Sequence, residues 1–200
     1  MRDLQDIRAI IRVPDADLAP PPELFLHRST LHGQAHVARV LVHALRLVQA
    51  TGFLEETAPL WASVYLHDLA RTHDGVSRRH GRDAWERLAT LPAVEALFAR
   101  GGVPAAALPA IGYAVTMHSA AEPDPADPAY RLAALLKDAD ALDRVRLGDL
   151  DPRFLRHEEA KGMAGFAQRL FDRTDGVLEP GPGLFAGLWR EVGLLLAGAP

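Results

Sequence analysis

Apolar positions recur with the period of an α-helix over most of the chain from position 31 onward. The clearest stretch has apolar residues at steps of 3, 1, 3, 1 and 3 positions, at Val37, Val40, Leu41, Ala44, Leu45 and Val48. Such steps place side chains on one helix face, and Gly52 follows as a typical helix end. Because no segment sustains the two-residue alternation of a half-buried strand, the pattern predicts an all-α fold of about seven to nine helices.

The other predicted helices follow from the same spacing and from residues that start or stop helices. Thr57 suits an N-cap, and Gly101 with Gly102 suits a helix end. The prolines between positions 122 and 128 require a loop. These signals predict helices over 57–68, 80–88, 92–100, 104–117, 132–142, 154–171 and 184–196.

The chain is long enough for one domain with a sizeable core, and it has 200 residues. A proline-rich stretch at 19–22 separates a leader, residues 1–28, which we expect to pack on the main body. The main body is a compact helical bundle over 29–200. Within it we expect a functional core at about 30–146 and C-terminal helices at 154–197.

Composition limits the chemistry that this chain can perform. It contains no cysteine, so a metal site must use histidine and carboxylate ligands. The start of the chain lacks the apolar stretch of a signal peptide, and no apolar run approaches the roughly 18 residues of a membrane span, so we expect a cytoplasmic protein. The net charge is −4, which gives no general signal for nucleic acid. Nothing in the sequence indicates an oligomeric state.

The pair His67-Asp68 is the most informative chemical feature, because it directly follows the apolar run 60–66. Two polar side chains at the inner end of a buried segment are costly unless something pairs with them. His36 lies upstream and Asp140 downstream, each on a helical apolar pattern. Two imidazoles and two carboxylates suit Mn, Fe, Co, Ni or Zn, and Mg less well. We therefore predict a divalent metal site.

The order of these residues resembles that of the HD-domain superfamily of metal-dependent phosphohydrolases, whose signature is His…His-Asp…Asp. The resemblance covers about positions 30–146 and implies that His36, His67, Asp68 and Asp140 are the metal ligands. The strings His32-Gly-Gln-Ala-His36 and His80-Gly81 are similar to a branch of small bacterial HD proteins. The Gly-Tyr-Pro element of the cyclic-dinucleotide phosphodiesterases is absent, and Ser119 stands where those enzymes have a second histidine, so that substrate is not implied.

Several further residues are candidates for the same site. Asp138 and Asp143 compete with Asp140 as the fourth ligand; the resemblance favours Asp140, which leaves Asp138 as a solvated group and Asp143 as a salt-bridge partner or a partner of a ligand. His80 and His118 could hold a second ion or only line the pocket. We expect His32, four residues before His36, to line the pocket too.

Arginines cluster after the His67-Asp68 pair, at Arg71, Arg78, Arg79 and Arg82. A guanidinium group binds phosphate oxygens in pairs, and Arg71 occupies the position where many relatives carry a phosphate-contacting lysine. Arg71 and Arg78 are therefore the predicted phosphate ligands, with Arg144 and Arg146 as second candidates. Such clusters are also common on solvated faces.

The resemblance implies hydrolysis of a phosphate ester or anhydride, with a nucleotide as the favoured small-molecule substrate and one or two divalent ions as cofactor. Asp68 could accept a proton from the attacking water, and Arg71 would neutralise charge on the phosphate. Two alternatives stay open. Some HD-fold proteins are di-iron oxygenases with six ligands of the types found at His36, His67, Asp68, His80, His118 and Asp140. The domain could also be a non-catalytic metal-bound sensor or interaction module.

Overall fold

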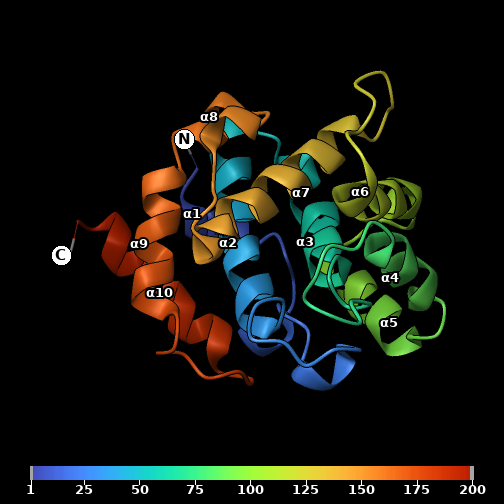
Figure 1. The fold of residues 1–200 in the computed structure, drawn as a ribbon, viewed down its shortest axis with the longest axis horizontal. Coiled ribbons are helices and arrows are strands. Elements are labelled where there is room, and N and C mark those ends of the chain that lie inside the picture. Colours follow the sequence, from blue (N-terminus) through green and yellow to red (C-terminus); the bar gives the residue numbers. More distant parts are fainter. Residues whose placement is uncertain (1, 199–200) are drawn as a thin grey trace.

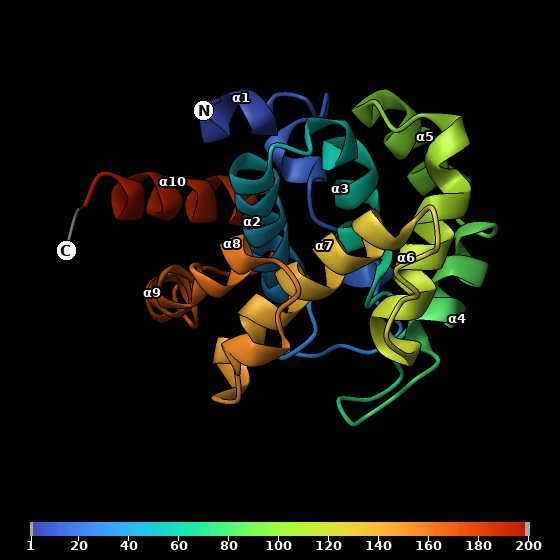
Figure 2. The ribbon, with the colours of Figure 1, turned by 90° about the horizontal axis from the view of Figure 1, so that it is seen from above.

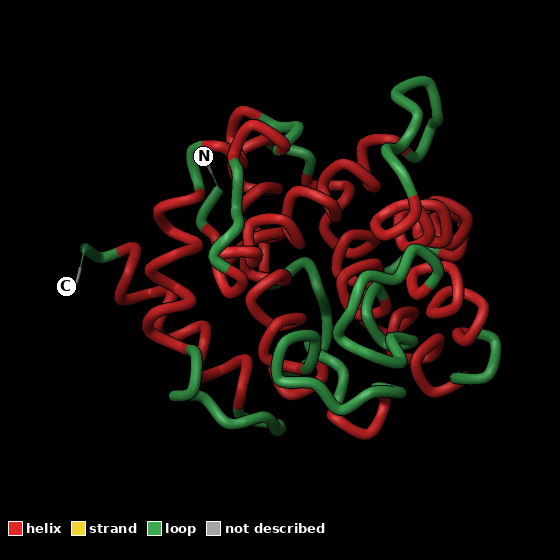
Figure 3. Tube along the Cα trace, in the orientation of Figure 1, coloured by secondary structure: helices red, strands yellow, loops and turns green. Residues whose placement is uncertain are grey.

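The fold is built entirely from helices and their connections (Figure 3). The computed structural model describes residues 2–198, and no strand occurs among them, which confirms the predicted all-α class. Eight α-helices within 2–198 have nine residues or more, and two others are single turns. The α-helices are α1 (Leu4–Arg8), α2 (Gln34–Thr51), α3 (Thr57–Leu66), α4 (His80–Leu88), α5 (Pro92–Gly101), α6 (Leu108–Ala120), α7 (Tyr130–Leu142), α8 (Glu158–Lys161), α9 (Ala164–Thr174) and α10 (Leu184–Leu196).

Short 3₁₀ segments join several of these helices: η1 (Asp15–Asp17), η2 (Pro22–Leu24), η3 (Leu54–Glu56), η4 (Ala105–Ala107), η5 (Asp143–Leu147) and η6 (Pro152–Phe154). The predicted glycine stops are confirmed. Gly52 after α2 and Gly102 after α5 have φ angles of +79° and +93°. Glycine adopts this left-handed conformation without the clash that a Cβ would cause.

Three sequence predictions of helix boundaries are wrong for physical reasons. Thr57 does not cap α3, because its hydroxyl donates to the carbonyl of Leu54. The helix predicted from position 104 begins only at Leu108, since Pro109 lacks an N–H and fits only the first turn. The helix predicted over 154–171 is divided, because Asp138 binds the backbone N–H groups of Arg156 and His157 and His157 is extended.

Helices α2 and α3 form the centre of the bundle, and α7 crosses them (Figure 1). Helices α4, α5 and α6 lie on one side of this central group, and α9 and α10 lie on the other (Figure 2). All ten residues of α3 are buried, which explains the nearly continuous apolar run before His67. In the described part of the chain, no single helix is both long and apolar enough to cross a bilayer; only the pair α5 and η4–α6, bent by 115°, passes that test together.

The N-terminal leader contributes directly to the same core. Leu4, Ile7, Ile11 and Leu18 are at most 4% exposed and belong to one apolar cluster with the buried face of α2. The indole nitrogen of Trp61 donates to the carbonyl of Leu18 at 2.9 Å. The leader therefore covers α2 and α3 rather than forming a separate unit.

Gly81 sets the distance between α4 and α6. A Cβ at this position would lie 2.1 Å from the carbonyl oxygen of Val115 and 2.8 Å from the ring of His118. We expect Gly81→Ala to force the helices apart and to lower the free energy of unfolding by roughly 1–3 kcal/mol, as overpacking does. Gly193 in α10 is the matched control, because a Cβ there would meet nothing within 4 Å. Urea denaturation should show Gly193→Ala to be neutral or stabilising, and an equal loss in both variants would contradict this packing.

His43 is a buried base whose two ring nitrogens have no hydrogen-bond partner within residues 2–198. Burial lowers the pKa of His43 to about 4. In the unfolded chain His43 binds a proton below its ordinary pKa of 6.5, whereas in the folded chain it stays neutral down to about pH 4. Its contribution to the free energy of unfolding is therefore complete above pH 6.5 and is lost as the pH falls towards 4. The wild type should lose this contribution on acidification, but His43→Leu should not. The unfolding free energy of His43→Leu relative to that of the wild type should therefore rise by about 3 kcal/mol from pH 7 to pH 4. If the difference in unfolding free energy between His43→Leu and the wild type does not change with pH, His43 is not a buried neutral base.

Candidate metal centre

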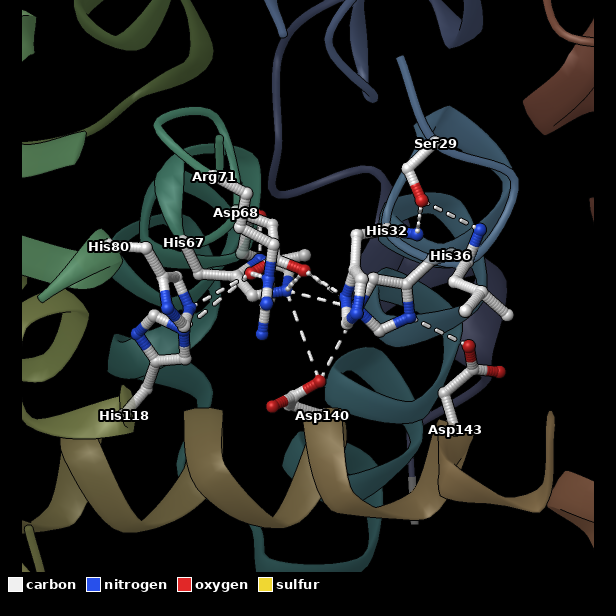
Figure 4. A network of polar contacts seen from close by, with 12 residues as sticks. Ser29, His32, His36, His67, Asp68, Arg71, His80, His118, Asp140 and Asp143 are labelled. Carbon is white, nitrogen blue, oxygen red and sulfur yellow. Dashed lines mark hydrogen bonds and ion pairs between the residues drawn. The ribbon is translucent and has the colours of Figure 1, made fainter. Parts of the chain in front are cut away.

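Seven histidine and aspartate side chains converge inside the bundle; six come from five helices, and the seventh, His32, lies just before α2 (Figure 4). His36 lies near the start of α2, and Asp140 lies near the end of α7. His67 ends α3, and Asp68 follows it directly. The first residue of α4, His80, and a residue near the end of α6, His118, complete the set.

One half of the centre contains the four residues predicted as ligands. The Nε2 atoms of His36 and His67 lie 3.2 Å apart. Asp68 Oδ2 lies 3.5 Å from the first of these nitrogens and 3.6 Å from the second. Asp140 Oδ1 lies 3.3 Å from the Nε2 of His36 and 4.0 Å from that of His67. His36, His67 and Asp140 form one group that could hold a metal ion, and Asp68 forms a second with His36 and His32.

The other half contains two histidines, from α4 and α6, that face the same carboxylate. The Nε2 atoms of His80 and His118 lie 2.8 Å apart. Asp68 Oδ1 lies 3.0 Å from the Nε2 of His80 and 3.9 Å from that of His118. Asp68 therefore directs Oδ2 to the first half and Oδ1 to the second.

Hydrogen bonds on the outer side of each ring orient all four histidines. Each Nδ1–H donates to a fixed acceptor: His36 to Asp143 Oδ2 at 2.8 Å, His67 to the Val64 carbonyl at 2.7 Å, His80 to the Ser77 carbonyl at 2.9 Å and His118 to the Val115 carbonyl at 2.5 Å. In the neutral ring this leaves a lone pair on each Nε2, directed inward. Metal-binding histidines are held in the same way. Two inward nitrogens that face each other are compatible when a proton or a metal ion lies between them.

The electrostatics of the first half leave a place for positive charge. Burial and Arg146 lower the pKa of His36, but hydrogen bonds to carboxylates, that of Asp140 first, raise it to about 9. Burial lowers the pKa of His67 to about 3, so this ring is neutral. Although burial raises the pKa values of Asp68 and Asp140, their histidine neighbours lower both below the ordinary range, and both carboxyls are ionised. The raised pKa of His36 means that its ring holds a proton between these carboxylates, and a metal ion bound here would take the place of that proton.

The donor set fits a first-row divalent metal. All candidate ligand atoms are imidazole nitrogens or carboxylate oxygens, which suit Mn, Fe, Co, Ni and Zn better than Mg. The Asp140 side chain is 30% exposed, whereas those of His36, His67 and Asp68 are at most 3% exposed. Asp140 is therefore the residue of this half that is most in contact with solvent.

Arg39 supports His36 from behind, and sequence reasoning missed it. Its Nε and Nη2 atoms bind the two oxygens of Asp143 at 2.7 and 3.1 Å, and Asp143 in turn accepts from His36. The side chains of Arg39 and Asp143 are at most 2% exposed, so the pair is fully desolvated. The position of Arg39 one helical turn after His36 was an available signal, because residues at i and i+3 share a helix face.

The structure places Arg71 against Asp68 rather than over the open side of the centre. Arg71 Nε donates to Asp68 Oδ1 at 2.7 Å, and Nη1 donates to the carbonyl of Gly75 at 3.2 Å. The chain turns after Asp68, where the Arg71 N–H binds the Asp68 carbonyl, so the side chain folds back on the carboxylate. In this position Arg71 orients a ligand.

Of the other three arginines in the cluster, two form ion pairs with carboxylates and one does not. Arg79 binds Asp83, and Arg82 binds Glu86, on the exposed face of α4. Arg78 is exposed and has no ion pair within residues 2–198, and its carbonyl accepts from Ser119, the neighbour of His118. Of these three, Arg78 is the one free to bind an incoming anion.

His32 and Arg146 lie at the edge of the centre. His32 is 8% exposed, and its Nδ1 lies 2.9 Å from Asp68 Oδ2. Arg146 donates to the carbonyls of Leu31 and Asp143, which ties the segment before α2 to η5. The other second candidate, Arg144, pairs with Asp149 on the surface.

Asp138, Asp140 and Asp143 have three different roles. Asp140 faces the centre, and Asp143 binds His36 as expected for a partner of a ligand. The prediction that Asp138 is solvated is wrong, because it is 0% exposed. It binds the backbone and side chains of Arg156 and His157, on the side of α7 away from the centre.

Lys137 is a further contributor that the sequence did not reveal. Its ammonium group donates to the carbonyls of Met117, His118 and Ala121 at 3.0 to 3.1 Å. These bonds satisfy the end of α6 and attach it to α7. Lys137 therefore fixes the segment that carries His118.

Comparisons with known proteins found no match: no protein-family model, no curated protein and no solved structure corresponds to this chain. The interpretation of the centre accordingly rests on its own geometry and on the order of its residues.

Removing single ligands should separate the two halves of the centre. We expect purified protein, saturated with Mn or Zn and then desalted, to carry about two ions per chain, because one carboxylate serves two ligand groups. Asp140→Ala and His80→Ala should each retain about one ion, and Asp68→Ala should retain almost none. Elemental analysis by mass spectrometry gives the ratio, and circular dichroism checks the helical fold.

Asp138→Asn is the matched control for this experiment, since Asp138 lies two residues from Asp140 but faces away from the centre. It should keep both ions. Full metal content in both Asp68→Ala and Asp140→Ala would overturn the assignment of the ligands.

Proposed function

We propose that this protein is a metal-dependent phosphohydrolase of the HD type that cleaves a phosphate ester or anhydride, with nucleotides as the first substrate class to test. The observation that carries the proposal is the carboxylate of Asp68, with one ligand group on each of its oxygens. Paired ions bridged in this way are a common device for hydrolysing phosphate esters. The order His36, His67-Asp68, Asp140 supports the same conclusion, because it resembles the HD signature.

The side chains around the centre suit the handling of a phosphate. A divalent ion bound here would supply polarisation of a phosphoryl oxygen and a lowered pKa for a coordinated water. Arg78 is free to pair with phosphate oxygens, and Arg71 holds the Asp68 carboxylate in position. His32 Nδ1 donates to Asp68 Oδ2, so Asp68 Oδ2 is the atom of this pair that could accept a proton from the water.

Oxygenase chemistry is the second candidate, and one specific observation favours it. All six residues of the ligand set, including His80 and His118, converge on one centre, and a di-iron oxygenase of this ligand order would need each of them. Iron content after purification without added metal, together with oxygen consumption by the reduced protein, distinguishes this candidate from hydrolysis. Two irons per chain and substrate-dependent oxygen uptake would favour the oxygenase.

Hydrolysis should be measured with p-nitrophenyl phosphate, bis-p-nitrophenyl phosphate and a panel of nucleoside mono-, di- and triphosphates, each with Mn, Co, Fe or Zn. We expect turnover in at least one class, and we expect Asp140→Ala to abolish it. Arg78→Ala should keep the metal and the fold and should reduce kcat/KM by roughly 10²-fold, because it removes one donor to phosphate oxygens.

Arg79→Ala is the control for Arg78→Ala, because Arg79 is the adjacent exposed arginine and is already paired with Asp83. It should change kcat/KM by less than about two-fold. A protein that carries its metal and is inert towards every phosphate class would contradict the proposed function.

A further inference from the structure

A cavity of about 310 Å³ lies beside the metal centre, in front of the N-terminus of α2. The segment from Pro22 to Gln34 forms nearly all of its wall, and Pro180, between α9 and α10, closes one side. None of the seven residues at the metal centre lines it. The cavity is thus a separate space with its own walls.

Long-range hydrogen bonds hold these walls in place. The N–H of Leu26 donates to the carbonyl of Leu69 at 3.1 Å, and Arg87 donates to the carbonyl of Leu24 at 2.6 Å. On the opposite side, the N–H of Gly181 donates to Gln34 Oε1 at 2.7 Å. The wall is therefore formed before any ligand binds, as in most small-molecule sites.

Two polar side chains of the lining, Gln34 and Arg28, are free to donate to a ligand, whereas Ser29 and His27 are paired with Asp74. Gln34 is only 5% exposed, and its Nε2 has no acceptor among residues 2–198, while its Oε1 is used by Gly181. The amide N–H₂ group of Gln34 is therefore available to donate to a ligand in the cavity. Arg28 lines the same cavity and has no ion pair in the described part of the chain.

The start of α2 adds to this preference. Gly33 and Gln34 line the cavity, and α2 begins there with no capping side chain. Unpaired N–H groups at a helix start favour an anion. Glu23 is the one carboxylate among the lining residues; it is exposed, so solvent screens its charge.

Phe25, Pro22 and Pro180 supply the apolar part of the lining. We propose that the cavity binds a small organic anion, with its carboxylate or phosphate group at Arg28 and Gln34 and its apolar body against Phe25. Its volume is at the low end of small-molecule sites, about 300–1,000 Å³, which restricts the ligand to about the size of a nucleoside.

Two hydrogen bonds connect the segment around the cavity to the metal centre. Ser29 lines the cavity, and its hydroxyl accepts the N–H of His32, whose ring contacts Asp68. Leu69, which holds the cavity segment through Leu26, directly follows Asp68. The organic anion has two possible sources. It is the far end of a substrate whose phosphate lies at the metal centre, an alternative that rests on the proposed function, or it is a separate molecule.

Binding should be measured by calorimetry on the full chain with two probes, benzoate and phenyl phosphate. Benzoate is an organic anion without a phosphoryl group, so its binding does not depend on hydrolysis. We expect both probes to bind the wild type, and we expect Arg28→Ala and Gln34→Glu each to raise Kd by about ten-fold or more, as loss of a charge-assisted hydrogen bond does. Gln34→Glu is nearly isosteric and keeps the oxygen that accepts from Gly181, so it should fold.

Arg79→Ala is the control and should leave both Kd values unchanged. Failure of both probes to bind the wild type, or binding that neither variant weakens, would overturn the proposal. Repeating the titration after chelation identifies the source of the ligand: tighter binding of phenyl phosphate with metal indicates the end of a substrate, and equal binding indicates a separate molecule. If benzoate binds to this cavity while no phosphate is hydrolysed, the cavity assignment stands and only the proposed function fails.

Discussion

The buried carboxylate of Asp68 is the constraint on which the rest of the structure depends. Its side chain is 3% exposed, and an ionised carboxylate in such a place costs several kcal/mol unless it is paired. Both oxygens are met by nitrogen atoms, from α2 and α3 on one side and from α4 and α6 on the other. Because these partners come from four different helices, the packing of the bundle and the formation of the centre require each other. Arg71 and the protonated ring of His36 balance this charge, and a bound cation would take over the part played by the His36 proton.

A second layer of contacts gives this centre its fixed geometry. Each imidazole is held at Nδ1 by a carbonyl or a carboxylate, so none of the four rings can turn its inner nitrogen away without losing a buried hydrogen bond. The pair of Asp143 and Arg39 extends this support from α2 to η5, and Lys137 attaches the end of α6 to α7. Such support is what allows ligands on separate helices to act as one site. Because His80 and His118 both face Asp68, α4 must lie close to α6, and Gly81 permits this close approach.

The sequence predicted the helical class, and it singled out His36, His67, Asp68 and Asp140, which the structure brings close together, because both predictions depend on local patterns. Helical spacing does not depend on distant contacts, and the His67-Asp68 pair follows an apolar run that could only be buried. The residues that sequence reasoning misjudged depend on distant partners. Asp138 was expected in solvent, but a segment eighteen residues later folds back on it and interrupts the predicted helix over 154–171. Arg71 was expected to reach over the open side of the centre. The direction of its side chain depends instead on a turn and on the carbonyl of Gly75. That His80 and His118 face Asp68 together follows from the packing of α4 on α6, which no local pattern encodes.

Anomalous X-ray diffraction from crystals soaked in Mn or Zn tests the central claim most directly, because it locates each ion without reference to activity. The account predicts two peaks about 3.5–4 Å apart, one on each side of the Asp68 carboxylate. The first should lie among His36, His67 and Asp140, and the second between His80 and His118. A single peak away from Asp68, or none at saturating metal, would contradict the account.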